Sequence, residues 1–414
     1  MTDAYIAGIA MTALGKFPEK SVKQLTREAV DGALKDAGCA MGDVNAAWFS
    51  NTRQALLEGQ NTIRGQCALR SMGFEGIPIA NVENACASGS TALIQALAHI
   101  KAGFCDVALV VGAEKMWFPE QREAMFKAFL GGTDVHDIDA TKARLAHIGD
   151  GVMPAEYAQK PGGLHSFFMD IYAAMARFHM KSFGTTMRQF AVAASKNHFH
   201  STLNPLSQYR EDMSVDQVLA DPVISWPLTR AMCAPLSDGG AAAVIVSDRV
   251  LAKKFDAKRA IKIMGAALVS GINRKPEDLG QHIGRRAALA AYEMAGVGPK
   301  DIDVAEVHDA SAYAEIQQIE NLGFCKMGEG GPFTDSGATR LGGSIPINTS
   351  GGLVSKGHPI GATGIIQLHE LVTQLRGEAG SRQVEGARIA AAENGGGFFQ
   401  VEEAATVVTV LGRA

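Results

Sequence analysis

The chain has 414 residues, of which 47% are hydrophobic and 20% are charged, and its formal net charge is −4. This length suggests two or three domains that each bury a core, and the composition excludes a disordered chain. The slightly acidic balance argues against nucleic acid as a partner. No run approaches the roughly 18 apolar residues that a membrane span needs, so we expect a cytoplasmic protein with no membrane span.

The six cysteines, at positions 39, 67, 86, 105, 233 and 325, are scattered and form no CxxC pair. This spacing fits neither a disulfide framework nor a zinc motif, and it indicates free thiols in a reducing compartment. We therefore expect neither disulfides nor a metal site.

Strand and helix patterns alternate along the first part of the chain. The patterns predict strands at residues 5–10, 44–50, 77–82 and 107–112, and helices at 22–37, at 55–72 and from Cys86 to Gly103. We expect Arg64 and Arg70 on the outer side of the helix at 55–72. Apolar strands that alternate with helices are typical of an α/β layered fold with a buried parallel sheet.

The character of the chain changes between Trp117 and Pro235, where several methionines and most of the histidines lie. We interpret this stretch as a mostly helical insertion that covers part of the rest of the fold. Its scattered cations are Lys127, Lys142, Arg144, Lys160 and Arg188. They would suit a phosphate-bearing ligand, although scattered charges more often form a solvated face.

The second half repeats the pattern of the first at an offset of about 259 residues, which indicates a duplication. The predicted elements at 5–10, 22–37 and 44–50 recur at 261–269, 283–295 and 302–307, and the strand at 107–114 recurs at 387–393. The helix after Cys86 corresponds to the one from Gly361 onward. We predict an N-terminal half (1–116 plus 236–255), an inserted loop domain (117–235) and a C-terminal half (256–414). Packed together, the halves would bring equivalent strand ends close to Cys86.

Cys86 lies where an apolar extended run gives way to small residues and then to a helical pattern. A thiol at or just before a helix N-terminus should have a lowered pKa, because unpaired N–H groups and the helix dipole stabilise the thiolate. Cys86 is therefore a candidate nucleophile. The alternative is an ordinary small core residue.

Three loops of the second half carry possible partners for Cys86. They contain His308 after one apolar strand, His358 in a glycine-rich turn before a helix, and Glu393 followed by Asn394 and three glycines after another strand. A lone histidine is more often structural, and a triple glycine is more often a turn. Their joint occurrence at equivalent strand ends favours a shared site.

The motifs NACASGS at 84–90, VHDA at 307–310 and GHPIGATG at 357–364, with the closing glycine-rich strand, resemble the thiolase superfamily. The His-Asp pair resembles the branch related to sterol carrier protein 2 thiolase. The resemblance covers nearly the whole chain. It implies the thiolase fold, with two duplicated α/β halves packed as α-β-α-β-α layers and an inserted, mostly helical loop domain that holds coenzyme A and shapes the acyl pocket.

The resemblance also implies an acyl-CoA acyltransferase that works through an acyl-enzyme on Cys86. His358 would be the base that activates Cys86, and His308 would donate a hydrogen bond to the thioester oxygen of the second substrate. Backbone N–H groups of Cys86 and of Gly395 or Gly396 would form the oxyanion hole.

The same resemblance implies substrate contacts from Ser237, Gly357 and Asn394, and a loop-orienting role for Asp309. Coenzyme A and its acyl esters would be substrates, with no permanently bound cofactor. Family members are homodimers or homotetramers, and we expect the same of this chain.

The chain departs from the family at the second cysteine, which moves the α-proton. Ordinary thiolases carry it where this chain has Glu393, and the sterol carrier branch can carry it where this chain has Ala310. Glu393 is therefore either a substitute acid and base or a structural carboxylate that binds backbone N–H groups.

The missing thiol leaves two other functions open. One is a thiolase-like retro-aldolase or C-acyltransferase that works with a small zinc-ribbon/OB-fold partner. The other, of a different class, is a non-catalytic lipid-binding or scaffold subunit.

Overall fold

The computed structural model describes residues 2–158 and 165–413, and its central feature is one long mixed sheet. The first half of the chain contributes β1 (Ala4–Met11), β2 (Ala46–Ser50), β3 (Ile79–Val82), β4 (Val107–Glu114) and β7 (Gly239–Ser247). The second half contributes β8 (Ile261–Ser270), β9 (Val304–Glu306), β10 (Ile389–Gly396) and β11 (Ala405–Arg413). Neighbouring strands follow the order β3-β2-β4-β7-β1-β8-β11-β10-β9.

The strand order shows two copies of one α/β unit. In the first half, β3, β2 and β4 are parallel, and β7 and β1 continue the sheet in antiparallel pairs. The second half repeats this order, with β9, β10, β11 and β8 in the places of β2, β4, β7 and β1. The halves join where β1 pairs with β8, at Tyr5 with Lys262 and at Ile6 with Ile261. The predicted duplication is confirmed.

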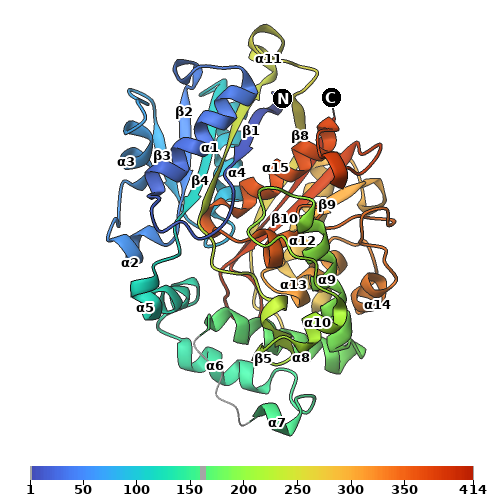
Figure 1. Cartoon of the computed structure of the whole chain (residues 1–414). Coiled ribbons are helices and arrows are strands. Elements are labelled where there is room, and N and C mark those ends of the chain that lie inside the picture. The colour runs from blue at the N-terminus through green and yellow to red at the C-terminus, as the bar shows by residue number, and fades with distance from the viewer. Residues whose placement is uncertain (1, 159–164, 414) are drawn as a thin grey trace.

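Helices lie outside and between the two half-sheets, which confirms the expected α-β-α-β-α layers. On the outer faces, α1 (Val22–Ala37) packs on the first half-sheet and α12 (Ile283–Ala295) on the second. Between the half-sheets lie α4 (Ser88–Lys101) and α15 (Thr363–Arg376). Separate clusters of buried apolar side chains fill the spaces between these layers. In Figure 1 the first half is blue to teal as far as β4, and the second half is orange to red from α12 onward.

The ends of α1 show how the local sequence sets a helix boundary. The Gln24 N–H donates to the Ser21 hydroxyl at 3.3 Å, and the Ser21 N–H donates to the Gln24 side chain at 2.8 Å. This reciprocal pair is a capping box. Gly38 ends the helix in the left-handed region with φ of 65°. The helix predicted at 22–37 therefore begins and ends as expected.

The two central helices approach each other closely because glycines line their contact. A Cβ atom on Gly364 would lie 2.0 Å from the Ser90 hydroxyl, and one on Gly89 would lie 3.1 Å from the Gly361 carbonyl. Residues without side chains permit this approach. The N-termini of α4 and α15, one from each half, consequently meet at the centre of the molecule.

The single helix predicted for residues 55–72 is wrong. Two short helices, α2 (Gln54–Glu58) and α3 (Arg64–Arg70), occupy this stretch. Between them, Gly59 and Ile63 have left-handed backbones with φ of 76° and 51°, and a right-handed helix cannot continue through such residues.

The predicted outer position of Arg64 is also wrong. Arg64 is partly buried, and its guanidinium donates to the Asn51 carbonyl at 2.8 Å. Arg70, by contrast, is exposed as expected.

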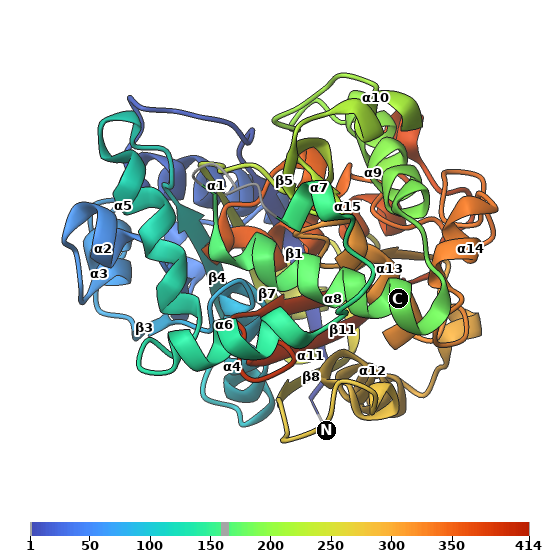
Figure 2. The same cartoon turned by 90° about the horizontal axis from the view of Figure 1, so that it is seen from below.

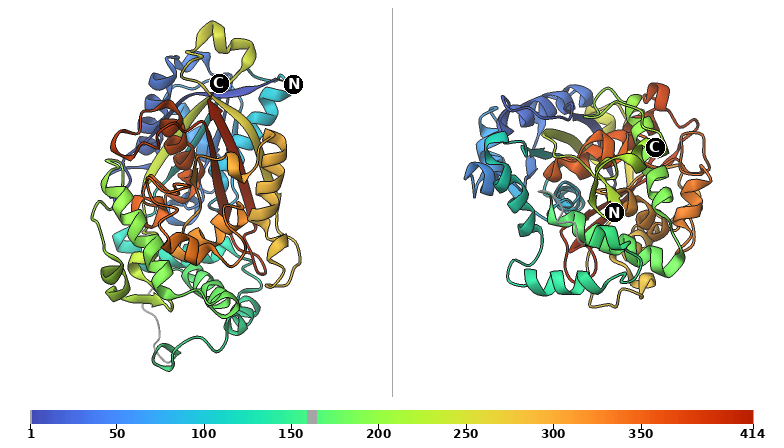
Figure 3. Two further views of the ribbon diagram at one scale, coloured as in Figure 1. Left: turned by 90° about the vertical axis from the view of Figure 1, so that its right-hand side faces the viewer. Right: turned by 60° about the horizontal axis from the view of Figure 1, so that its bottom comes forward.

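The segment between β4 and β7 covers the end of the molecule opposite the two termini (Figures 1 and 2). Its helices and strands are α5 (Arg122–Lys127), α6 (Ile138–His147), α7 (Ala155–Ala158), α8 (Phe167–Phe183), α9 (Met187–Thr202), α10 (Val215–Ala220), β5 (Val223–Ser225) and β6 (Leu228–Thr229). Figure 3 shows the same arrangement from the side. This segment, which we call the insertion, lies over the strand ends as a cover would.

Three further α-helices are α11 (Asp248–Lys254), α13 (Ala312–Asn321) and α14 (Gly330–Asp335), and a short π-helix covers Gly352–Lys356. In the parts of the chain that the structure describes, no helix combines the length and apolar character that crossing a membrane requires.

Candidate active site

Cys86 lies in a tight turn between the end of β3 and the start of α4 at Ser88, as predicted. Ala85 has a left-handed backbone with φ of 47°. The Ser88 hydroxyl holds the turn, because it accepts from the Asn84 N–H at 2.9 Å and donates to the Ala85 carbonyl at 2.6 Å. The left-handed residue carries a strain on the order of 1 kcal/mol, which the surrounding bonds offset. The turn thus fixes the direction of the Cys86 side chain.

The structure brings Cys86, His308 and His358 together. The sulfur of Cys86 and ring nitrogens of both histidines all lie within 4.8 Å of one another. The two imidazole rings are 5.2 Å apart between centroids and inclined by 66°. One half of the chain supplies the thiol and the other supplies both histidines, so the duplication creates the cluster.

His358 is oriented as a proton acceptor. Its Nδ1 lies 2.7 Å from the Thr363 hydroxyl, and that hydroxyl donates to the Pro359 carbonyl at 3.1 Å. Thr363 must therefore accept from His358, which assigns the ring proton to Nδ1 and leaves Nε2 with a free lone pair. Burial, with His308 and Arg53 nearby, lowers the pKa of His358 well below its usual value. The ring is neutral and available as a base.

His308 presents a ring without protein partners. Neither of its ring nitrogens is hydrogen-bonded to any described residue, and burial lowers its pKa to about 3. Its backbone N–H donates to the Glu393 carboxyl at 3.0 Å. A neutral imidazole always carries one N–H donor, so His308 can donate to a ligand in the cluster.

Glu393 lies within β10, three residues before the strand ends at Gly396, and it is beside the His308 backbone. It is fully buried, and burial together with the nearby Glu403 and Asp309 raises its pKa well above the usual value. Its Oε1 has no hydrogen-bond partner among the described residues. Burial and the neighbouring acids therefore favour the protonated form of Glu393.

The expected lowering of the Cys86 pKa is wrong. Burial raises the pKa of this thiol to about 12, although the charge of Arg53 and an N–H bond from Gly397 act in the opposite direction. Excluding water disfavours the thiolate more than these groups stabilise it. The resting site holds a neutral thiol beside a neutral imidazole, so Cys86 needs a base to react.

Alkylation of Cys86 should therefore depend steeply on pH. Its iodoacetamide labelling rate is expected to rise about tenfold per pH unit from pH 7 to 9, because only the thiolate reacts. Peptide mass spectrometry after timed quenching measures this rate. A rate that levels off below pH 9 would contradict the raised pKa.

The glycine run after Glu393 lies against the Cys86 turn. A Cβ atom on Gly396 would lie 2.2 Å from the Asn84 carbonyl and 2.5 Å from the Ala87 nitrogen. Gly397, which the motif reasoning did not single out, donates its N–H to the sulfur of Cys86. The expected oxyanion-hole residues Gly395 and Gly396 directly precede it in β10.

In the described part of the chain, the main cavity wall does not include Ser237, Gly357 or Asn394. Ser237 accepts from the His358 N–H at 2.9 Å, and a Cβ on Gly357 would lie 2.8 Å from the Ser237 hydroxyl. Asn394 accepts from Ser90 of α4 at 2.8 Å. These residues hold the histidine loop and the α4 N-terminus in position.

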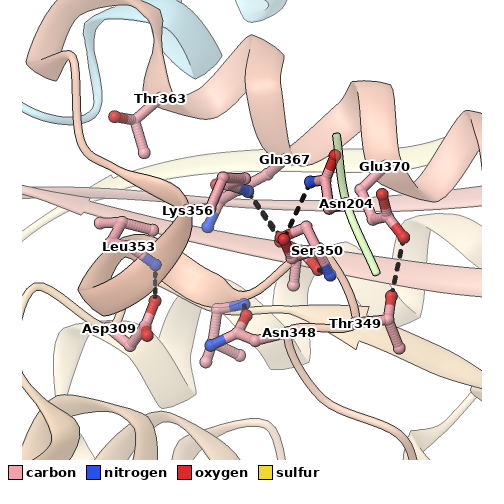
Figure 4. A network of polar contacts seen from close by, with 12 residues as sticks. Asn204, Asp309, Asn348, Thr349, Ser350, Leu353, Lys356, Thr363, Gln367 and Glu370 are labelled. Carbon is pink, nitrogen blue, oxygen red and sulfur yellow. Dashed lines mark hydrogen bonds and ion pairs between the residues drawn. The ribbon is translucent and has the colours of Figure 1, made fainter. Parts of the chain in front are cut away.

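Asp309 orients its surroundings, as expected. Its carboxylate accepts from the Leu353 N–H at 2.6 Å and from the Asn197 amide at 2.9 Å. Figure 4 shows the contact between Asp309 and Leu353, and it also shows the buried Lys356, which donates to Ser350 at 2.7 Å. The polar network fixes the turn that leads to His358.

Cys86 and His358 lie on the wall of a cavity of about 820 Å³. Its apolar wall comes from the insertion and includes Phe126, Phe129, Phe168, Met169, Met213 and Ile224. Its cations are Lys16, Arg53, Arg122, Arg210 and Arg230. The cavity has the size of a cofactor or substrate site.

The cations expected from the sequence lie elsewhere. Arg188 pairs with Asp335 at 2.5 Å, Arg144 pairs with Asp137 at 2.9 Å, and Lys127 faces a different cavity. Lys142 lies near Asp139 at 3.9 Å on an exposed face, and Lys160 is outside the described residues. The solvated-face interpretation is therefore the better one for these residues.

Arg53 and Tyr172 are cavity residues that the sequence reasoning missed. Arg53 is buried, lies 4.7 Å over the Phe129 ring and donates to the Ala128 carbonyl. Tyr172, on α8, lines the main cavity and also a smaller one behind it. Neither residue belongs to a recognisable motif, so only the fold reveals them.

Two family models match the chain: the thiolase N-terminal domain over residues 4–249 and the thiolase C-terminal domain-like family over residues 267–413. The acetyl-CoA acetyltransferase of Methanothermobacter thermautotrophicus is 36% identical over 400 residues, which cover 96% of this chain and 97% of that protein. Sterol carrier protein 2 of Bos taurus is 36% identical over 398 residues, which cover 94% of this chain and 69% of that protein.

Solved structures share the fold. The structure described as an Ltp2-ChsH2(DUF35) aldolase matches with a TM-score of 0.76 and 24% identity, over 99% of this chain and 98% of that chain. Human mitochondrial 3-ketoacyl-CoA thiolase in complex with CoA matches with a TM-score of 0.69 and 16% identity, over 100% of this chain and 98% of that chain.

Proposed function

This chain belongs to the thiolase superfamily and is an acyl-CoA acyltransferase of the thiolase type, and we propose that it works through an acyl-enzyme on Cys86. The observation that carries the proposal is the convergence of the Cys86 thiol with His308 and His358 within 4.8 Å. Cys86 and His358 also line the wall of the large cavity.

In the first step, His358 Nε2 takes the Cys86 proton, and the thiolate attacks the keto carbon of a 3-ketoacyl-CoA. Backbone N–H groups of Cys86 and of Gly395 or Gly396 stabilise the oxyanion. The carbon–carbon bond breaks, the acyl group stays on Cys86, and the electron pair remains on the acetyl-CoA enolate. His308 donates a hydrogen bond to the enolate oxygen.

Glu393 supplies the proton that the enolate carbon takes up, which yields acetyl-CoA and the Glu393 carboxylate. Coenzyme A then loses its thiol proton to Glu393 and attacks the acyl-Cys86 thioester. The leaving thiolate recovers its proton from His358. All protons are thereby restored, and the reverse sequence is the Claisen condensation. The raised pKa of Glu393 and its Oε1, which has no hydrogen-bond partner among the described residues, support this role.

The insertion would hold coenzyme A and shape the acyl pocket. Lys16, Arg122 and Arg210 are exposed cations of the cavity, which suits the phosphates of coenzyme A. The apolar rings deeper in the cavity suit an acyl chain.

We further propose that the chain has three parts: an N-terminal half (1–116 plus 236–255), an inserted domain (117–235) and a C-terminal half (256–414). It would work as a homodimer or homotetramer without a permanently bound cofactor. The six free thiols support a cytoplasmic location.

Incubation with acetyl-CoA is expected to add one acetyl group to the protein, visible by intact mass spectrometry. The Cys86→Ala variant should show no adduct, and the matched variant Cys233→Ala, which alters another cavity cysteine, should keep it. A Cys-His-His cluster also matches a zinc ligand set, so the reaction is run with and without a chelator. An adduct that persists in Cys86→Ala, or that forms only with a metal present, would refute Cys86 as the nucleophile. If the wild-type protein forms no adduct, a non-catalytic binding role is favoured.

A second candidate function is a retro-aldolase or C-acyltransferase that works with a small zinc-ribbon/OB-fold partner. The absence of a thiol at position 310, where Ala310 lines the cavity, favours it. The similar fold of the Ltp2-ChsH2(DUF35) aldolase adds support. Comparing 3-ketoacyl-CoA and 3-hydroxyacyl-CoA cleavage separates the two functions, because only an aldolase cleaves the hydroxy compound without coenzyme A.

A further inference from the structure

A second buried carboxyl group lies next to Glu393. Glu403 is 7% exposed, and it lies across Gly395: a Cβ atom there would meet Glu403 Cγ at 2.8 Å and Cδ at 3.3 Å. Residues two apart on a strand share a face and are separated by about 6.6 Å. Glu393 and Gly395 are two apart on β10, so the missing side chain of Gly395 makes room for Glu403 beside Glu393.

Each carboxyl group keeps one oxygen without a partner. Glu393 Oε2 accepts from His308 and Glu403 Oε1 accepts from the Gln318 amide at 3.0 Å, whereas Glu393 Oε1 and Glu403 Oε2 have no hydrogen-bond partner among the described residues. Leaving two buried carboxylates ionised side by side is strongly unfavourable. The pair must therefore retain at least one proton.

A small cavity of about 20 Å³ lies behind the pair and is lined by Glu403, His282, Gln317 and Tyr172, among others. This volume can hold one water molecule. His282 Nδ1 accepts from the Gly284 N–H at 3.1 Å, which places the ring proton on Nε2, 3.6 Å from Glu403 Oε2. The cavity thus offers a water site with several polar partners on the side away from the substrate.

We propose that Glu403 controls the protonation of Glu393 through its charge, and that Glu403 exchanges its own proton with water in the small cavity while acyl-CoA fills the main cavity. The proposal rests on the proposed role of Glu393 as acid and base. The negative charge of Glu403 favours the protonated form of Glu393, so Glu393 holds the proton that it gives to the enolate and then takes one back from the coenzyme A thiol. Glu403 touches no substrate, and it is a positioning residue that acts through Glu393.

The charges around the pair support this division of roles. Glu393 faces Glu403, Asp309 and the neutral His308. Glu403 faces Glu402 and Arg274 as well as Gln318, His282 and Tyr172. Burial, with Glu402 nearby, raises the pKa of Glu403 to about 7. Glu403 therefore ionises near neutral pH, and its negative charge holds the proton on Glu393.

The test is the pH dependence of kcat/KM for thiolysis of acetoacetyl-CoA in Glu403→Gln. Thiolysis needs protonated Glu393, so activity falls as pH rises through its pKa. Removing the neighbouring charge lowers that pKa, and the alkaline limb is expected to move down by about one pH unit. Glu403→Asp keeps the charge, so its alkaline limb should lie close to the pH at which the wild-type limb lies.

The control is Glu320→Gln, which removes another buried carboxylate, one that contacts His179 at 3.1 Å. It should lose thermal stability without moving the limb. If Glu403→Gln kept the wild-type alkaline limb of the pH profile while Glu393→Gln was inactive, the role of Glu403 alone would be overturned. Full activity of Glu393→Gln would overturn the role of Glu393 and this inference with it.

If Glu403→Gln fails to fold, infrared spectroscopy of the wild type decides. A protonated carboxyl band at neutral pH that Glu393→Gln removes, and that shifts as Glu403 titrates, supports the pair. A band that does not respond to pH overturns it.

Discussion

Replacing Cys86 with serine is expected to lower kcat for thiolysis of acetoacetyl-CoA by at least about 10⁴-fold. The thiol, which is half-buried on the cavity wall, already has a pKa of about 12, and a hydroxyl is far less acidic. The neutral His358 can activate a thiol that is held within 4.8 Å, but it cannot ionise a serine to a comparable extent. Steady-state kinetics at saturating coenzyme A measure the loss.

The affinity for acyl-CoA should remain, because the serine side chain has nearly the same shape and the cavity wall is unchanged. Calorimetric titration with a non-hydrolysable acyl-CoA analogue checks this. Cys233→Ser, which changes another thiol of the same cavity, should stay close to wild-type activity. If Cys86→Ser kept more than about a hundredth of the wild-type kcat, a group other than Cys86 would have to be the nucleophile.

The convergence of the cluster could be predicted because it follows from the duplication. Cys86 follows β3 in the first half, His308 follows β9 in the second, and Glu393 lies in the carboxyl-terminal half of β10. Parallel strands place their carboxyl ends at one edge of a sheet, and two copies packed through α4 and α15 bring those edges together. Periodicity and turn residues were sufficient to show this much.

The protonation state of the site could not be predicted from the sequence. The helix N-terminus next to Cys86 is visible in the sequence, but the apolar cover of the insertion is not, because residues such as Phe129 and Phe168 reach the site from distant helices. Exclusion of water then dominates, and it raises the pKa of the thiol where the local pattern predicts a lower one.

The cations of the cavity were misplaced for a related reason. Local composition identified the basic residues of the insertion, but a charge contributes to a cavity only if the fold turns it there. Arg188 is paired with Asp335 instead, whereas Lys16 reaches the cavity from the loop after β1 and lies 4.0 Å over the ring of Trp117. Such pairings join residues far apart in the chain.

Replacing Lys356 with methionine is expected to lower the free energy of unfolding by on the order of 3–5 kcal/mol. Lys356 is 1% exposed and its ammonium lies 3.2 Å from the fully buried Glu306 carboxylate. Its removal leaves that carboxylate without a counter-charge in a site that water cannot reach. Lys356 also precedes Gly357 and His358, so activity should fall with stability. Thermal unfolding at a fixed scan rate measures the change.

The pH dependence distinguishes lost charge pairing from lost packing. Without Lys356, the pKa of Glu306, already raised by burial, rises further above its value in the unfolded chain. A carboxyl whose pKa is raised by folding contributes nothing at low pH, where it is protonated in both states, and it destabilises the fold as pH rises through its unfolded-state pKa. Lys356→Met should therefore be least destabilised at low pH and most destabilised above neutrality. The double variant Lys356→Met/Glu306→Gln, which has no ionisable group left at the pair, should recover part of the stability and lose this pH dependence.

The control is Lys326→Met, which changes an 86% exposed side chain and should leave the free energy of unfolding within about 0.5 kcal/mol of the wild type. If Lys356→Met lost equal stability at every pH, packing rather than the Glu306 charge would explain the loss.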